Sequence, residues 1–257
     1  MNLDKLKIDF RDPMVILLCC LLIFLSGGSL LFGNAQGHFT LELDAAFGGD
    51  NPGYTGFIDE ASVNEKTVNA LEDLLKQDER FTVLRTHESA TGAAVSETAE
   101  KIKADGPDMV LSIHAGWSPS ASDSGTRIYT DLPGTPGSQE AQKFAQEIQK
   151  AFNTEDWNAS LNYLYYHQAQ GNTWTVDIRD MAAEQPAEEN PSTWTLFEKT
   201  DVPCVIAEQF FISNKADIER WNNDQGYQLI AQKYYSAICA YLGIGEMEFE
   251  AAEEAGE

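Results

Sequence analysis

The run from Pro203 to Asn214 constrains the fold of this chain more than any other feature. It is largely apolar with β-branched residues, opens with a proline and closes with Ser213-Asn214. A run of this kind is typical of a strand that is buried on both faces, as in a parallel sheet covered by helices. The chain is therefore expected to fold around a central strand in an α/β domain.

Glu208 lies near the far end of this run, which makes it the first candidate for chemistry. Ligands of α/β proteins usually bind at the carboxyl edge of the sheet, where a carboxylate at the end of a central strand projects into the crevice. Glu208 is therefore a candidate catalytic residue. The alternative is a structural role, in which Glu208 caps the next turn or pairs with a neighbouring Lys or Arg.

The rest of the chain alternates between strand and helix patterns, as the first predicted helix illustrates with Val63, Val68 and Leu71 at helical spacing. Strands are predicted over 39–44, 81–84, 108–113 and 126–130, and helices over 61–77, 96–104, 138–152 and 227–242. This alternation favours parallel pairing with right-handed crossovers. We predict an α/β domain over residues 39–244, with a mostly parallel, twisted sheet flanked by helices.

Two regions do not follow this pattern. Residues 158–195 are rich in Asn, Gln, Tyr and Trp without clear periodicity, so we expect a long surface excursion near the site that contributes substrate contacts. Residues 245–257 contain six glutamates and no basic residue, so we expect an acidic disordered tail.

The amino-terminal segment predicts a membrane anchor. Residues 14–32 carry no charge, and at a helical rise of about 1.5 Å per residue they span about 28 Å, close to the thickness of a bilayer core. Basic residues occur in 1–13 and not in the linker 33–38, which favours a cytoplasmic amino terminus and an extracytoplasmic body, a single-pass protein of the cell membrane. A signal peptide cleaved near Asn34–Gly37 is the alternative.

Charge and cysteine content limit the function classes. The 257 residues include 41 acidic and 17 basic ones, a formal net charge of -24, which repels phosphate backbones and makes nucleic acid an improbable partner. Cys19 and Cys20 fall in the uncharged segment. Cys204 and Cys239 are expected to be small buried apolar groups rather than a disulfide.

Three side chains are expected to meet at one edge of the sheet. His114 closes one predicted strand, Glu208 closes another, and Glu60 stands at the entrance of the first helix. Histidine and carboxylates at one place suit a catalytic zinc site with an open position for water. The alternatives are a hydrogen-bonded structural histidine, and a glutamate that meets the positive end of the helix dipole.

The order of these motifs resembles the zinc-dependent N-acetylmuramoyl-L-alanine amidases of the amidase-3 type, over about residues 39–242. The matching segments are Leu43–Gly49, Glu60–Asn64, Ser112–Ala115, Gly125–Tyr129 and Pro203–Asn214. The resemblance implies that Glu60 and His114 correspond to two zinc ligands and Glu208 to the catalytic glutamate. It also implies peptidoglycan as the substrate, with cleavage of the bond between N-acetylmuramic acid and L-alanine.

One ligand position departs from the family pattern, because Phe47 stands where the family has its first histidine ligand. Two hypotheses follow. In the first, the protein is a membrane-anchored, exported zinc amidase whose missing ligand comes from elsewhere, with Asp50, Asp59 and His167 as candidates.

In the second hypothesis, the protein is a catalytically silent module of the amidase fold. It binds peptidoglycan or regulates a partner hydrolase, and its cleft is lined by Phe47, Phe210 and Trp117. The zinc content of the protein, and the effect on cell-wall hydrolysis of replacing the Glu208 carboxylate, distinguish the two hypotheses.

Overall fold

The computed structural model describes residues 37–89, 91–168, 174–182 and 192–249. The chain divides into two compact units, Met1–Gly37 and His38–Glu257, and the description that follows concerns the second. Within the described residues, none of the helices combines the length and the apolar character that a membrane crossing needs. The predicted span over 14–32 lies outside the described residues, so it stays a prediction.

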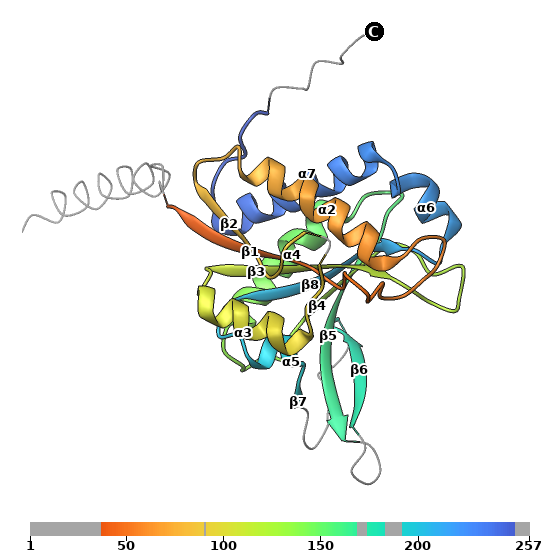
Figure 1. The fold of residues 1–257 in the computed structure, drawn as a ribbon, viewed down its shortest axis with the longest axis horizontal. Coiled ribbons are helices and arrows are strands. Elements are labelled where there is room, and N and C mark those ends of the chain that lie inside the picture. The colour runs from red at the N-terminus through yellow and green to blue at the C-terminus, as the bar shows by residue number, and fades with distance from the viewer. Residues whose placement is uncertain (1–36, 90, 169–173, 183–191, 250–257) are drawn as a thin grey trace, which may run out of the picture. The chain divides into compact units, whose positions relative to one another are not determined.

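A single mixed sheet forms the centre of the second unit (Figure 1). Its strand order is β2-β1-β3-β8-β4-β5-β6, with β7 paired to β5. The strands β2, β1, β3 and β8 are parallel to one another, and β4 is parallel to β5, whereas the β8–β4, β5–β6 and β5–β7 pairings are antiparallel. The bounds are β1 Phe39–Ala45, β2 Phe81–Arg85, β3 Met109–Gly116, β4 Thr126–Thr130, β5 Ala159–Gln168, β6 Trp174–Asp180, β7 Ser192–Thr193 and β8 Cys204–Phe211.

Helices cover both faces of this sheet. In Figure 1, α2 and α7 lie along the upper side with α4 behind them, and α3 and α5 lie below. The two sides correspond to two separate clusters of buried apolar residues. The helix bounds are α2 Glu60–Leu75, α3 Val95–Asp105, α4 Ser138–Phe152, α5 Thr195–Glu198, α6 Lys215–Trp221 and α7 Asp224–Leu242.

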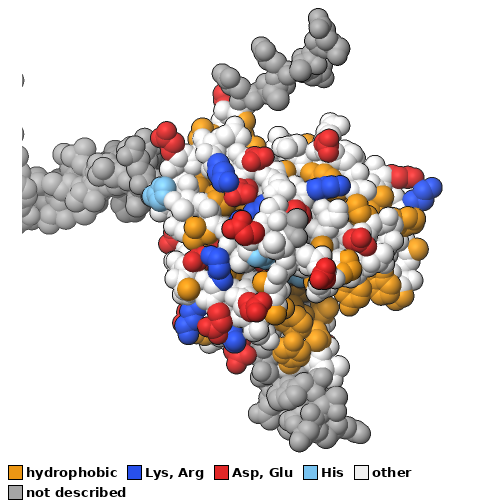
Figure 2. All heavy atoms as spheres, in the orientation of Figure 1, with side chains coloured by type: hydrophobic (Ala, Val, Ile, Leu, Met, Phe, Trp, Pro, Cys, Tyr) orange, Lys and Arg blue, Asp and Glu red, His pale blue; other side chains and the backbone are white. Residues whose placement is uncertain are grey.

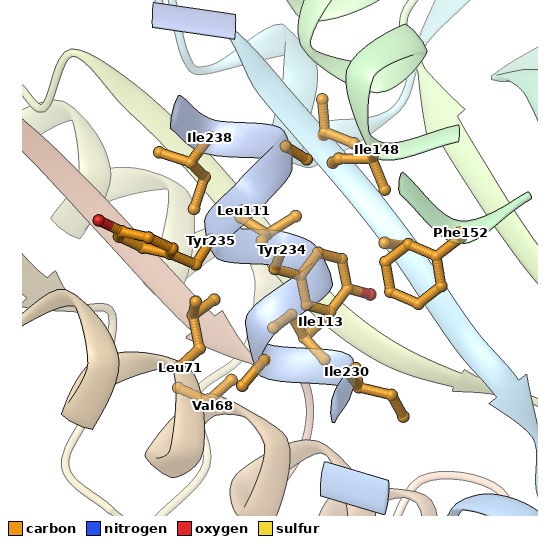
Figure 3. Packing of buried hydrophobic residues seen from close by; sticks show 14 of the residues in the cluster. Val68, Leu71, Leu111, Ile113, Ile148, Phe152, Ile230, Tyr234, Tyr235 and Ile238 are labelled. Atoms are coloured by element: carbon orange, nitrogen blue, oxygen red, sulfur yellow. The ribbon is translucent and has the colours of Figure 1, made fainter. Parts of the chain in front are cut away.

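The larger cluster lies between β3 and the helices α2, α4 and α7 (Figure 3). Leu111 and Ile113 point from β3 toward Ile230 and Tyr234 of α7, and all four are fully buried. The ring of Tyr234 contacts the ring of Phe152 from α4, with centroids 4.9 Å apart. The predicted central position of β8 is thus confirmed by the strand order and by its burial, and the strand predicted over 108–113 is confirmed as β3, which pairs with it. Cys204 and Cys239 are buried in separate clusters, with free thiols.

The region 158–195 differs from its prediction. Instead of a long irregular excursion, it supplies β5 and β6, which pair from Asn162↔Asp180 to Gln168↔Trp174 and extend the sheet. All five residues from Leu161 to Tyr165 are buried, so both faces of β5 are covered and its burial gives no alternating strand signal. The excursion prediction was therefore wrong for the described part of this region. Residues 169–173 and 183–191 lie outside the described residues.

The pairing register between β3 and β8 shifts by one residue near their carboxyl ends. His114 pairs with Glu208, but Gly116 pairs with Phe211, so β8 holds one extra residue there. A bulge of this kind breaks the alternation of side chains between the two faces. Phe210 consequently enters the larger apolar cluster, with its side chain fully buried. Its predicted place in the cleft lining was wrong.

The first residues of the predicted acidic tail contact the body. The guanidinium of Arg80 donates to the carbonyl oxygen of Gly245 at 2.8 Å, and the ring of Phe249 lies 5.0 Å from that of Tyr235 on α7. Residues 250–257 lie outside the described residues, so the disorder of the tail stays a prediction.

Candidate functional site

A cavity of about 570 Å³ opens at the carboxyl edge of β1, β3 and β8. Glu60, His114 and Glu208, the three residues selected from the sequence, all line it. Glu60 begins α2, whereas His114 and Glu208 face each other across the β3–β8 pairing. The strands continue two residues beyond His114 and three beyond Glu208, so these side chains lie just before the strand ends rather than at them.

Glu60 and His114 form a direct pair. The Nδ1 of His114 lies 3.1 Å from Oε1 of Glu60, a carboxylate that is 2% exposed. The backbone N–H of Tyr54 donates to the other oxygen, Oε2, at 3.1 Å. Burial lowers the pKa of His114, but the hydrogen bond and the negative charge of Glu60 outweigh it and hold that pKa above its ordinary value.

Glu208 is held by the neighbouring antiparallel strand. The hydroxyl of Tyr129 donates to Oε2 of Glu208 at 2.9 Å, and the guanidinium of Arg127 lies 3.9 Å from the same oxygen. Burial raises the pKa of Glu208 above its ordinary value, although the Tyr129 hydrogen bond and the Arg127 charge oppose the shift. A carboxyl group with these partners is placed to exchange a proton with a ligand in the cavity.

The sequence reasoning missed three polar residues around Asp44, at the end of β1. Both oxygens of Asp44 accept hydrogen bonds, from the hydroxyl of Thr86 at 2.6 Å and from that of Ser112 at 2.5 Å. The Nε2 of His87 lies 2.9 Å from the carbonyl oxygen of Ala45 and 3.9 Å from Asp44. The alternation of β3 could have pointed to Ser112, which lies on the His114 face of that strand. Thr86 and His87 lie in a turn that carries no such signal.

Phe47, which stands at the first ligand position in the sequence pattern, lines the cavity beside His114. Its ring meets the imidazole of His114 edge-on, with centroids 5.6 Å apart. Its φ is 68°, a value that few residues with a β-carbon adopt. A β-carbon at Gly53 would lie 2.6 Å from this ring and 2.9 Å from Glu60 Oε2, so the loop around the ring requires glycine there.

The residues of the cavity do not fit the expected zinc centre. Glu60 and His114 offer two donors, and Phe47 has no lone pair to supply a third. Asp50 and Asp59 are exposed and outside the cavity lining, and Asp59 accepts a hydrogen bond from Thr55. The backbone of His167 pairs with Thr175 in β6, and its side chain lies outside the described residues. Among the residues that the structure describes, no group of three His, Cys, Asp or Glu side chains could hold a metal ion.

The opposite end of the cavity is apolar. Leu164 of β5, Val176 and Ile178 of β6, and Trp194 before α5 line it. Figure 2 shows hydrophobic side chains gathered where β5 and β6 leave the body, above the grey residues. Part of region 158–195 thus lines the cavity, mainly through strands, whereas the expected substrate contacts stay a prediction. Trp117 is not part of the lining and instead stacks on Tyr54 at the edge of the cavity.

Comparisons with known proteins agree on one family. A family model described as N-acetylmuramoyl-L-alanine amidase, Amidase_3, matches residues 42–240. Comparison with curated proteins gives no match. Among solved structures, the catalytic domain of CwlV, an N-acetylmuramoyl-L-alanine amidase from Bacillus (Paenibacillus) polymyxa var. colistinus, aligns with a TM-score of 0.61 at 20% identity, covering 80% of this chain and 99% of that one.

A second solved structure is the CwlD amidase from Clostridioides difficile in complex with the GerS lipoprotein. It aligns with a TM-score of 0.60 at 18% identity, covering 80% of this chain and 98% of that one. At these identities the two structures establish the fold.

Proposed function

Because the chain belongs to the N-acetylmuramoyl-L-alanine amidase family, we propose that it acts on bacterial peptidoglycan at the junction between N-acetylmuramic acid and L-alanine. The observation that carries the proposal is the meeting of Glu60, His114 and Glu208 in one cavity at the carboxyl edge of the sheet. An amide junction offers one N–H donor and one carbonyl acceptor. The carboxylate of Glu208 suits the donor, because Tyr129 holds Oε2 and leaves Oε1 for a ligand.

In this chain the cavity binds the junction without a zinc step. The donor set supports this part of the proposal, since a catalytic zinc site uses three protein ligands and here an aromatic ring takes the place of one. The hydrogen bond between Nδ1 of His114 and Oε1 of Glu60 further supports it, because these two atoms are already engaged with each other. The protein would then recognise the wall, or present it to a partner hydrolase.

Cleavage of the amide bond is a second candidate, favoured by the environment of Glu208. Burial raises the pKa of this group, and a proton acceptor works best when its pKa approaches the ambient pH. The hydroxyl of Tyr129 and the guanidinium of Arg127 fix the carboxyl group in one orientation. These features support a proton-transfer role for Glu208 and are independent of whether a metal binds.

Residues 14–32 are proposed to anchor the protein in the cell membrane, with residues 1–13 in the cytoplasm and the body outside. The uncharged run and the basic residues before it support this arrangement. Protease added to intact protoplasts should digest the body. A body that is protected until the membrane is lysed would contradict the proposal.

The first experiment measures binding and cleavage together. The full-length chain, in mild detergent, is titrated calorimetrically with N-acetylmuramoyl-L-alanyl-D-isoglutamine, and the products are separated by chromatography with and without added zinc. Glu208→Gln should weaken binding or abolish any cleavage, whereas Glu155→Gln, at an exposed position, serves as the control for loss of one carboxylate. Binding without products supports the first candidate, and products that disappear in Glu208→Gln support the second. If the chain neither binds nor cleaves the ligand, the proposed function is refuted.

A further inference from the structure

Two exposed aromatic rings stack on each other beside the cavity. Tyr54 is 58% exposed and Trp117 is 39% exposed, and their rings stack with centroids 5.3 Å apart and planes 9° from parallel. Isolated exposed apolar side chains are ordinary, but in a stacked exposed pair each ring holds the other in place, and an outward ring face is left for a ligand to stack on. We call these two rings the Tyr54–Trp117 platform.

The backbone on both sides of the platform is fixed. The N–H of Tyr54 donates to Glu60 in the cavity at 3.1 Å, and the N–H of Phe57 donates to the carbonyl oxygen of Ile212 at 2.9 Å. After Trp117, the N–H of Ser118 donates to the hydroxyl of Ser213 at 3.0 Å. The backbone next to both rings is therefore held against the residues that follow β8. A surface that is ordered before binding loses little entropy when a ligand arrives.

The platform continues the cavity wall. Tyr54 lines the cavity together with Glu60 and His114, while Trp117 follows His114 on the same strand end. A ligand whose amide junction lies against His114 and Glu208 must leave the cavity past one of its walls. The platform offers such an exit, and the apolar side chains of β5 and β6 line the opposite end.

Charge decides which flat ligand suits the platform. The chain carries a formal net charge of -24, and the neighbouring loop side chains Asp59 and Asp123 are acidic, which disfavours nucleobases carried on a phosphate backbone. A pyranose ring is uncharged and has an apolar face of C–H groups that matches an aromatic surface. We propose that the Tyr54–Trp117 platform is a carbohydrate subsite that stacks on a sugar ring of the glycan strand. This inference rests on the proposed function, which brings the glycan to the cavity mouth.

The test uses two probes that separate the platform from the cavity. Glycan strands stripped of their stem peptides probe the platform, and N-acetylmuramoyl-L-alanyl-D-isoglutamine probes the cavity. Binding of the full-length chain to stripped glycan is measured by calorimetry. Tyr54→Ala and Trp117→Ala should each weaken it about three- to tenfold, whereas Tyr54→Phe and Trp117→Phe, which keep a ring, should retain most of it. Leu229→Ala, which shortens an exposed apolar side chain on α7, controls for general surface hydrophobicity and should change nothing.

The two probes separate the carbohydrate subsite from the proposed function. Stripped glycan that binds the wild type but not the alanine variants supports the platform, even if the muramoyl dipeptide fails to bind and the proposed function falls. A muramoyl dipeptide that binds while stripped glycan does not bind the wild type overturns the platform and leaves the proposed function intact. Equal glycan binding by wild type and alanine variants also overturns it. The proposal is also overturned if the wild type self-associates, does not bind glycan, and loses the self-association in Trp117→Ala. The platform would then be a contact between copies of the protein.

Discussion

Replacing Glu42 by glutamine should remove a large part of the pH dependence of stability. Glu42 lies in β1 between Leu84 of β2 and Val110 of β3, with its side chain 0% exposed. Neither of its carboxylate oxygens has a hydrogen-bond partner in the described part of the chain. Burial, followed by the negative charge of Asp105, raises the pKa of Glu42 from 4.5 to about 7.

The magnitude follows from this shift. A rise from 4.5 to about 7, at about 1.4 kcal/mol per unit, corresponds to roughly 3 kcal/mol. Because the pKa is raised in the folded state, folding favours the protonated form of Glu42. The group therefore costs little stability below pH 4.5, an increasing amount between pH 4.5 and 7, and its full amount above pH 7. Glutamine cannot ionise, so in Glu42→Gln the contribution of residue 42 to the free energy of unfolding does not change with pH.

The assay is urea unfolding, followed by tryptophan fluorescence between pH 5 and pH 8. The free energy of unfolding of the wild type should fall relative to that of Glu42→Gln as the pH rises, by an amount on the order of 1–3 kcal/mol. Glu155→Gln, which removes an exposed carboxylate, is the control for net charge. A difference between wild type and Glu42→Gln that stays constant with pH, or that changes in the opposite direction, would refute the reasoning.

Three further changes test local parts of the structure. Asn214→Ala removes the side chain that caps α6, which accepts from two backbone N–H groups, so denaturant unfolding should show a loss of about 1–2 kcal/mol, and no loss would contradict the cap. Ile113→Ala opens a cavity in the fully buried core and should cost about 2–5 kcal/mol in the same assay, whereas a cost below 1 kcal/mol would place Ile113 outside the core. Tyr129→Phe removes the hydrogen bond that lowers the pKa of Glu208, so carboxyl NMR titration should show a higher pKa than in the wild type, and an unchanged titration would show that the bond is not formed.

Long apolar runs made the centre of the fold predictable. The segments around β3 and β8 are buried on both faces, and such runs carry a strong signal in the sequence. Parallel strands also end at a common edge, so Glu60, His114 and Glu208 could be placed together before their contacts were known. The pairing of His114 with Glu60 required only that α2 begins at this edge.

The edge of the sheet was harder to predict. In β6, Val176 and Ile178 alternate with Asp177 and Arg179, a strand pattern that was present but short and surrounded by polar sequence. The bulge in β8 could not be predicted, because a single extra residue leaves no periodic trace and yet moves Phe210 from the cleft into the core. Contacts such as the bond from Tyr129 to Glu208 depend on which strand lies beside β8, and the sequence does not specify that order.

The central claim is that Phe47 prevents this cavity from holding zinc. It is tested most directly by the zinc affinity of the full-length chain in detergent, measured by calorimetry for the wild type, Phe47→His and Phe47→Leu. Histidine tolerates a positive φ better than phenylalanine does, so Phe47→His should fit the loop and complete the three ligands with Glu60 and His114.

The account predicts little zinc binding by the wild type and by Phe47→Leu. It predicts an increase in affinity of at least about 100-fold in Phe47→His. Near-stoichiometric, tight zinc binding by the wild type, unchanged in Phe47→His, would contradict the central claim and favour the zinc amidase.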